Sequence, residues 1–364
     1  MRVGLVGTGF GVRVHLPAYR RCEEVEVIGL ASAQRERAEA AASAWGIPFA
    51  TDDYRELLTR DDIDVIDVCT PPGTHHEITM AALAAGKHVL CEKPFASYVA
   101  AAREMADEAD RTGLVNAVVH EMRYDPVRRH MRHLVNEGYL GTPQFIVAAV
   151  HADHGTNPAQ EPYYWGWAVL ADKGGGFVMS SLSHHLDLLQ FTFGPFGTLQ
   201  ATSTTLIREK PVLTFEYRDG DPIGPNTPTV GTRPVDADDT VVMQGGFESG
   251  ALLSLSGSWS LRFPGGNWVD AYGDAGTLRL QPDGTLLGAR HGDARLQPLE
   301  IPASLALDPA DGEHRLTPNF SALARELAAT VAGEPPAEPV MATFADGLRL
   351  QRVLDQARGF AAPT

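Results

Sequence analysis

The chain has 364 residues, 44% apolar and 21% charged, which suits a globular protein of two domains and excludes a disordered chain. Its net charge of −16 would repel phosphate backbones, so we expect no nucleic-acid partner. No apolar run approaches the roughly 18 residues of a membrane span, and the first residues read as a buried strand rather than a secretory signal. We therefore expect a cytoplasmic protein without membrane association, whose three cysteines, Cys22, Cys69 and Cys91, are small core residues.

Up to about residue 120, short apolar runs alternate with helix-like stretches. The predicted strands are 3–6, 25–31, 65–69, 88–91 and 114–119, and the predicted helices are 33–45, 54–58, 75–85 and 98–111. This alternation is typical of βαβ units, and strands that are apolar throughout indicate a parallel sheet covered on both faces. The sequence predicts an α/β Rossmann domain, a doubly wound parallel sheet, over residues 1–122.

A glycine-rich loop follows the first predicted strand and precedes a helix. Its first glycine allows a tight turn, and its second lets the backbone approach a pyrophosphate at the N-terminus of the helix. The strict pattern places a third small residue at position 12, where this chain has Val12. The loop predicts a dinucleotide site, with a purely structural turn as the alternative, and the expected contacts are Gly7, Thr8, Gly9, Phe10 and Gly11.

The second predicted strand ends without the carboxylate that usually binds the ribose 2′-hydroxyl of NAD. Ser32 stands there, and Arg35 and Arg37 follow closely. A small hydroxyl and two arginines favour the 2′-phosphate of NADP, so we expect NADP in preference to NAD. The alternative is that both arginines lie on the solvent face of a helix.

Beyond residue 123 successive strands are separated by turn signals. The pattern predicts strands at 144–150, 199–207, 240–247, 251–259, 268–272 and 277–280, a loop at 210–239, and helices at 126–137, 320–332 and 343–360. Strands joined by tight turns imply antiparallel pairing. We predict an α+β domain for substrate binding and oligomerisation over residues 123–364, with an open, mostly antiparallel sheet and helices on one face.

Several short motifs, together with the glycine loop, resemble those of the Gfo/Idh/MocA family, the glucose–fructose oxidoreductase and inositol dehydrogenase type. They occur in the family's order along essentially the whole chain. The motifs are CTPPGTH at 69–75, CEKP at 91–94, RYDP at 123–126, GYLG at 138–141, GGG at 174–176 with SHHLD at 183–187, and PNF at 318–320.

The resemblance implies a hydride-transfer site. Ligands of open α/β sheets bind at the carboxyl ends of the strands, so the loops after two of the strands should converge on the cofactor. Lys93 would hydrogen-bond the reacting oxygen, and His184 would act as general acid/base. The expected cofactor contacts in these loops are Thr70, Pro71, Pro72, His75, Glu92 and Lys93.

The chain departs from the family pattern before His184. Many members carry an aspartate four residues earlier, where this chain has Ser180, and Leu182 replaces the usual glycine. A serine cannot supply the charge of a carboxylate, so the proton relay would use another group. The candidates are Tyr163, Tyr164, His120, Glu121 and His154.

The expected substrate contacts beside Lys93 and His184 are Arg123, Tyr163, Trp165 and Ser180. Tyr163 and Trp165 are included because aromatic planes bind sugar rings. Packing at an interface is the alternative for the aromatic pair. We expect no metal, because His151, Asp153 and His154 lack a common strand face and a fourth ligand.

The predicted function is an NAD(P)-dependent dehydrogenase or reductase of a sugar, inositol or similar cyclic polyol, acting as a homodimer or homotetramer. The alternatives are an NAD-using glycoside hydrolase or lyase and a non-catalytic dinucleotide sensor.

Overall fold

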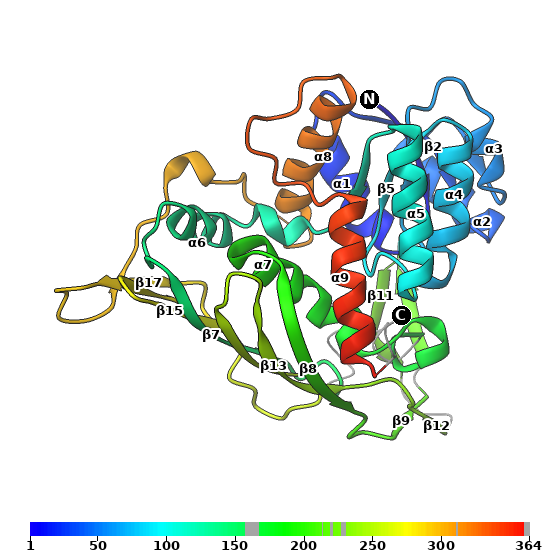
Figure 1. Cartoon of the computed structure of the whole chain (residues 1–364). Helices are drawn as coiled ribbons and strands as arrows, with labels where there is room; N and C mark the ends of the chain where they lie inside the picture. Colours follow the sequence, from blue (N-terminus) through cyan, green and yellow to red (C-terminus); the bar gives the residue numbers. More distant parts are fainter. Residues whose placement is uncertain (157–166, 213, 219–220, 227–230, 311, 360–364) are drawn as a thin grey trace. The chain divides into compact units, whose positions relative to one another are not determined.

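The computed structural model describes residues 1–156, 167–212, 214–218, 221–226, 231–310 and 312–359 (Figure 1). The contacts that residues make in space divide the chain into two compact units. Unit 1 comprises Met1–Asp125 and Leu307–Gln351, and unit 2 comprises Pro126–Ala306 and Arg352–Thr364. The predicted domain boundary between residues 122 and 123 stays a prediction, because the two compact units are defined by contacts and not by which segments fold independently.

Unit 1 contains the predicted parallel sheet. Its six strands are arranged in the order β3-β2-β1-β4-β5-β6, with the reversal of strand order between β1 and β4 that marks a doubly wound fold. Five of the strands were predicted, whereas β3 was missed because two residues carry no periodic signal. The strands are β1 Arg2–Val6, β2 Glu26–Ala31, β3 Ala50–Thr51, β4 Val65–Val68, β5 His88–Cys91 and β6 Asn116–Val118.

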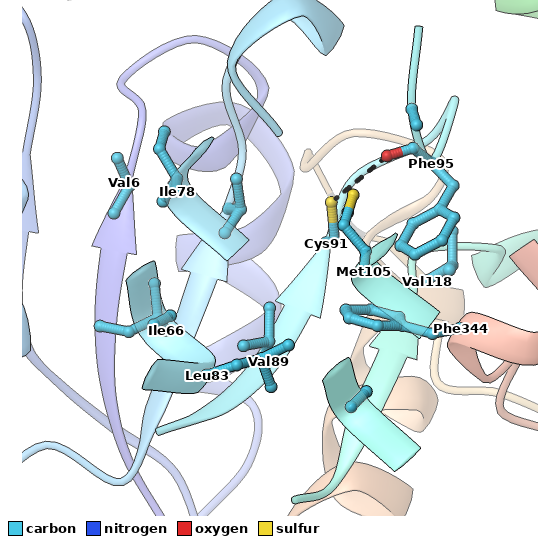
Figure 2. Close-up of a cluster of buried hydrophobic side chains, with 14 of the residues drawn as sticks. Val6, Ile66, Ile78, Leu83, Val89, Cys91, Phe95, Met105, Val118 and Phe344 are labelled. Carbon is cyan, nitrogen blue, oxygen red and sulfur yellow. Dashed lines mark hydrogen bonds between the residues drawn. The ribbon is translucent and has the colours of Figure 1, made fainter. Parts of the chain in front are cut away.

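Neighbouring residues of each strand point to opposite faces of the sheet. Because the strands are largely apolar, both faces are apolar, and helices cover both of them. On one face Leu5 of β1 packs with Leu16 and Ala38. On the other face Val6 belongs to a cluster with Ile78 and several further side chains (Figure 2). The helices that supply these contacts are α1 Leu16–Arg20, α2 Arg35–Trp45, α3 Arg55–Leu58, α4 His75–Ala84 and α5 Val99–Thr112.

The segment 307–351 returns to unit 1 late in the sequence. It contains α8 Thr317–Val331 and the first part of α9 Phe344–Ala357, so both predicted C-terminal helices are confirmed. The rings of Phe344 and Phe95 lie 4.6 Å apart in the core cluster (Figure 2). The Val118 N–H donates a hydrogen bond of 2.8 Å to Ala342 O, so this segment also continues the hydrogen bonding of the β6 edge.

Unit 2 is built on an eight-stranded sheet in the order β18-β17-β16-β15-β7-β14-β13-β8. All its strand pairs are antiparallel except β14 with β7, which confirms an open, mostly antiparallel sheet. The helices α6 Pro126–Asn136 and α7 Ser183–Phe193 lie on the same side of it (Figure 1). The strands are β7 Pro143–His151, β8 Phe196–Thr204, β13 Thr240–Phe247, β14 Leu252–Ser258, β15 Asn267–Gly273, β16 Gly276–Leu280, β17 Leu286–Arg290 and β18 Gln297–Pro298.

The predicted loop at 210–239 is wrong in part. The hairpin β10 Thr214–Arg218 with β11 Asp221–Asn226 lies within it, and β9 Glu209–Pro211 pairs with β12 Thr232–Pro234. Pro222, Gly224 and Pro225 obscured the second strand of the hairpin. Proline is tolerated there because each strand of a two-stranded ribbon is an edge. In the part of the chain that the structure describes, no helix has the length and apolar character needed to cross a bilayer.

Candidate active site

The glycine loop after β1 has the backbone that a dinucleotide requires. Gly7 adopts a positive φ of 122°, and a Cβ at this position would lie 2.0 Å from the carbonyl oxygen of Cys69. Gly9 is exposed, and a Cβ built on it would meet no atom within 4 Å. The first glycine is therefore fixed by sterics, whereas the second leaves its backbone open to a phosphate group.

The helix after this loop explains why Val12 is tolerated. The chain forms one π-helical turn, Gly11–His15, before α1 begins. A Cβ on Gly11 would lie 3.1 Å from the Leu5 side chain, so Gly11 allows the close approach of helix and strand that the pattern assigns to position 12. Val12 packs partly buried against the same hydrophobic cluster. The loop residues fit a bound pyrophosphate.

The ribose end of the site lies after β2. The hydroxyl groups of Thr8 and Ser32 are 3.3 Å apart, and Ser32 carries no charge that would repel a phosphate. Arg35 is exposed, but its guanidinium pairs with Glu39 at 2.9 Å and with Asp52 at 3.3 Å. Arg37 is also exposed at the start of α2. A 2′-phosphate bound to Arg35 would share the guanidinium group with these two carboxylates.

His75 ties together the loops that follow β4 and β5. Its Nε2 lies 2.8 Å from Thr70 O and its Nδ1 lies 3.1 Å from Pro94 O. Burial lowers the pKa of His75, although both carbonyl groups favour the protonated ring. The Lys93–Pro94 peptide bond is cis, and Lys93 is half-buried. His75 therefore fixes the relative position of these two loops, and its contact with a cofactor stays a prediction.

A buried cluster of charged side chains lies under the same edge of the sheet. His15, fully buried, has its Nδ1 at 2.7 Å from Asp67 Oδ2 and its Nε2 at 3.0 Å from Glu92 Oε1. The Tyr19 hydroxyl donates a hydrogen bond of 2.8 Å to Asp67. Burial lowers the pKa of His15, but Asp67 and Cys69 together more than offset this and the pKa lies well above its usual value. Burial raises the pKa of Glu92, but the hydrogen bond and charge of His15, together with Lys93, outweigh this and the pKa lies below its usual value.

Among the described residues, His15, Cys69 and Glu92 are a group with metal-ligand atoms within 4.8 Å of one another. Burial raises the pKa of the Cys69 thiol to about 11. Both nitrogens of His15 already face carboxylates. The cluster is thus a hydrogen-bonded network, and the expectation that the protein uses no metal stays a prediction.

Glu121 and Arg123 follow β6 at the same edge. Glu121 is 1% exposed, and within the described part of the chain neither of its carboxyl oxygens has a hydrogen-bond partner. Burial, aided by the charge of Glu92, raises the pKa of Glu121 to about 7. Arg123 is 4% exposed and contacts Asp346 at 3.5 Å and Val340 O at 3.3 Å. These contacts give Arg123 a structural task in unit 1, and its role in substrate binding stays a prediction.

The predicted acid/base histidine belongs to unit 2. His184 stands at the start of α7, directly after a π-helical turn, Val178–Leu182, which contains the buried Ser180. The Ser183 hydroxyl donates a hydrogen bond of 3.0 Å to Ser180 O. His184 is half-buried, and the side chain of the adjacent His185 lies 3.5 Å from Asn267. The proximity of His184 to Lys93 stays a prediction.

The structure brings most of the predicted cofactor residues to one edge of the parallel sheet in unit 1, since they all follow the carboxyl ends of neighbouring strands. Tyr163 and Trp165 lie outside the described residues. Sequence reasoning did not connect His15 or Asp67 to the site. The signal for Asp67 was a single carboxylate within the apolar strand β4, because a buried charge needs a partner.

The fold, the open glycine loop and the residues gathered beyond the strand ends define a protein of the dinucleotide-binding Rossmann class. The model of an oxidoreductase family with an NAD-binding Rossmann fold, GFO_IDH_MocA, matches residues 1–120, and the GFO/IDH/MocA C-terminal domain matches residues 128–279. The chain belongs to this family, and it is an oxidoreductase with an NAD-binding domain.

Known proteins agree with this assignment. An uncharacterized oxidoreductase of Synechocystis sp. is 27% identical over 87% of this chain and 83% of its own length. Levoglucosan dehydrogenase of Pseudarthrobacter phenanthrenivorans is 29% identical over 70% of this chain, and the match spans 66% of that enzyme. The solved structure of levoglucosan dehydrogenase with NADH and L-sorbose has a TM-score of 0.84, with 24% identity over 99% of this chain and 96% of the other, and shows the same fold.

Proposed function

We propose that the protein transfers a hydride between a nicotinamide cofactor and a secondary hydroxyl or ketone of a sugar or related cyclic polyol. The observation that carries the proposal is the position of Lys93, two residues after the end of β5, at the same edge of the sheet from which the glycine loop leaves β1. The relative named levoglucosan dehydrogenase supports a sugar as the substrate class.

In this proposal the residues of the chain bind, orient and move a proton. The Gly9 backbone and the helix from Gly11 hold the pyrophosphate, and Lys93 hydrogen-bonds the reacting oxygen and stabilises negative charge as it develops there. His184 carries the proton of the hydroxyl group. When bound, the nicotinamide supplies the site that accepts or donates the hydride.

The test is turnover of the purified protein with NAD⁺ or NADP⁺ and a panel of levoglucosan, glucosides, inositols and ketoses, followed by absorbance of the reduced cofactor. Lys93→Ala should lower kcat by roughly 100-fold or more and leave cofactor affinity nearly unchanged. Lys173→Ala is the matched control, because Lys173 is exposed. A Lys93→Ala variant with normal turnover would remove Lys93 from the mechanism.

Two other outcomes would replace the proposal. Consumption of a glycoside without net reduction of the cofactor would identify a hydrolase or lyase that uses NAD transiently. Tight cofactor binding without turnover of any member of the panel would identify a dinucleotide sensor.

For the cofactor itself, we propose that NADPH binds more tightly than NADH. The absence of a carboxylate at Ser32 and the exposed guanidinium groups of Arg35 and Arg37 support this preference. Calorimetric titration of both cofactors tests it, with Arg35→Ala expected to weaken NADPH selectively. The preference would be disproved by NADH binding at least as tightly, which is the result expected if Glu39 and Asp52 retain Arg35.

We further propose a homodimer or homotetramer formed through the open face of the unit 2 sheet. Phe145 is 40% exposed, Val242 52% and Leu252 59%, and strand pairing places all three on one face. Light scattering after size-exclusion chromatography should show an oligomer that Leu252→Glu dissociates. A monomeric wild-type protein would refute this.

We also propose that the protein works in a reducing compartment such as the cytoplasm. Its three cysteines, which are free and buried, support this proposal.

A further inference from the structure

We propose that His15 is a positioning residue for Lys93, because it holds the Glu92 carboxylate that in turn holds the Lys93 backbone. The effect on turnover rests on the proposed role of Lys93, whereas the hydrogen-bonded link can be tested without any substrate.

The first step is the state of the imidazole ring. Nδ1 faces Asp67 Oδ2 at 2.7 Å, and Nε2 faces Glu92 Oε1 at 3.0 Å. An ionised carboxylate can only accept a hydrogen bond, so both ring nitrogens donate and the ring is an imidazolium. Phe320 stacks on the ring with centroids 4.0 Å apart, and the exposed fraction of His15 is 0%. The cation is therefore fixed between two anions and shielded from water.

The second step is the use of both oxygens of Glu92. Oε1 accepts from His15, and Oε2 accepts from the backbone N–H of Lys93 at 2.9 Å. Glu92 is 6% exposed. Without the bond from His15, one oxygen of a buried carboxylate would lose its partner, and the side chain would gain freedom to rotate away from Lys93. The orientation of the Lys93 peptide group thus depends on His15, which lies 77 positions before Glu92.

The third step is where His15 comes from. It ends the π-helical turn Gly11–His15 that directly follows the dinucleotide loop. The same ring therefore joins the segment that would hold the pyrophosphate to the end of β5 that carries Lys93. A buried ion pair that served stability alone would not need to contact both. This geometry indicates that His15 fixes the position of the dinucleotide loop relative to Lys93.

Two substitutions separate this role from general stabilisation. The amide nitrogen of asparagine can occupy the place of Nδ1, and the longer glutamine can place its amide nitrogen near Nε2. His15→Asn therefore retains a donor to Asp67 and loses the donor to Glu92, whereas His15→Gln does the opposite. Both remove the positive charge and one of the two hydrogen bonds, so they should lower the melting temperature by similar amounts.

The readout is the backbone amide of Lys93. The chain has four lysines, so ¹⁵N-lysine labelling gives four backbone signals, and Lys93→Arg identifies the one from Lys93. We expect His15→Asn to move this amide proton upfield and to speed its hydrogen exchange by about tenfold or more, whereas His15→Gln stays close to the wild-type protein. With a substrate in hand, His15→Asn should have a kcat at least about tenfold below that of His15→Gln, with a similar KM for the cofactor.

Tyr19→Phe is the matched control. It removes a hydrogen bond to Asp67 on the far side of the network and leaves the contact between His15 and Glu92. It should lower stability without moving the Lys93 signal. Where a His15 variant does not fold, Glu92→Ala tests the second half of the link, because alanine offers the Lys93 N–H no side-chain acceptor.

The proposal is overturned if His15→Asn and His15→Gln give the same Lys93 signal and the same kcat, or if Glu92→Ala leaves the amide unchanged. If the Lys93 amide responds as expected but the wild-type protein turns over no substrate, the positioning link stands and the proposed function fails. If Lys93→Ala abolishes turnover but the Lys93 amide signal is the same in the His15 variants as in the wild-type protein, the proposed function stands and this inference fails.

Discussion

The two first glycines of the dinucleotide loop should respond to alanine in opposite ways. In Gly7→Ala the new Cβ would lie 2.0 Å from the carbonyl oxygen and 2.7 Å from the carbonyl carbon of Cys69, on a backbone with φ of 122°. A non-glycine residue in this region costs about 1–3 kcal/mol, and relief of a backbone clash costs a similar amount. We expect the free energy of unfolding to fall by roughly 3–5 kcal/mol, a large part of a typical domain's stability.

Gly9→Ala should leave the fold unchanged, because its Cβ would meet no atom within 4 Å. The added methyl group instead occupies the space through which a pyrophosphate approaches the backbone. We expect the Kd for NADH and NADPH to rise at least tenfold, which corresponds to about 1.4 kcal/mol.

Urea denaturation and calorimetric titration of the variants measure both effects. Gly265→Ala is the control, since Gly265 lies in unit 2 and its Cβ would also meet open space. A Gly7→Ala protein as stable as Gly265→Ala would refute the steric reasoning. A Gly9→Ala protein that binds both cofactors like the wild type would show that the pyrophosphate does not lie against this loop.

Two more substitutions probe unit 1. The pKa of Glu121 is raised from 4.5 to about 7, so the folded state holds this proton more tightly than the unfolded state, and stability present below pH 4.5 is lost as the pH rises to 7. Relative to wild type, Glu121→Gln should gain roughly 3 kcal/mol more at pH 8 than at pH 4, and a pH-independent difference in denaturation midpoints would contradict the burial of a neutral acid. Phe344→Ala should cost about 3–5 kcal/mol, because Phe344 is 1% exposed in the core cluster. The fully exposed Phe263 supplies the control, and equal losses for Phe263→Ala and Phe344→Ala would show that 307–351 does not contribute to the core of unit 1.

The sequence by itself determined the parallel sheet, the dinucleotide loop and the residues that follow its strands. These features depend on interactions between near neighbours, namely the alternation of apolar runs and helices and the positions of glycine and proline. The carboxyl ends of parallel strands share one edge, so the sequence predicted that the loops after β4 and β5 converge, whereas Arg123 after β6 was assigned to the site only through the family resemblance.

The same reasoning failed where the signal was short or was obscured by proline and glycine. The two residues of β3 show no period, and the hairpin β10–β11 contains residues that are typical of turns. The return of 307–351 to unit 1 is a long-range contact, and no local pattern in that segment indicates which sheet it joins.

Only the tertiary structure decided the polar network beneath the site. The three residues are at least 25 positions apart along the chain: His15 ends a π-helical turn, Asp67 lies in β4 and Glu92 follows β5. Although Glu92 stands in a recognisable motif, no local pattern connects it to His15 or Asp67. A buried charge is stable only beside a partner, and the partner is set by which strand ends become neighbours in the folded sheet. Local sequence therefore specified the parts of this site, whereas the folded chain specified which of them donate hydrogen bonds to one another.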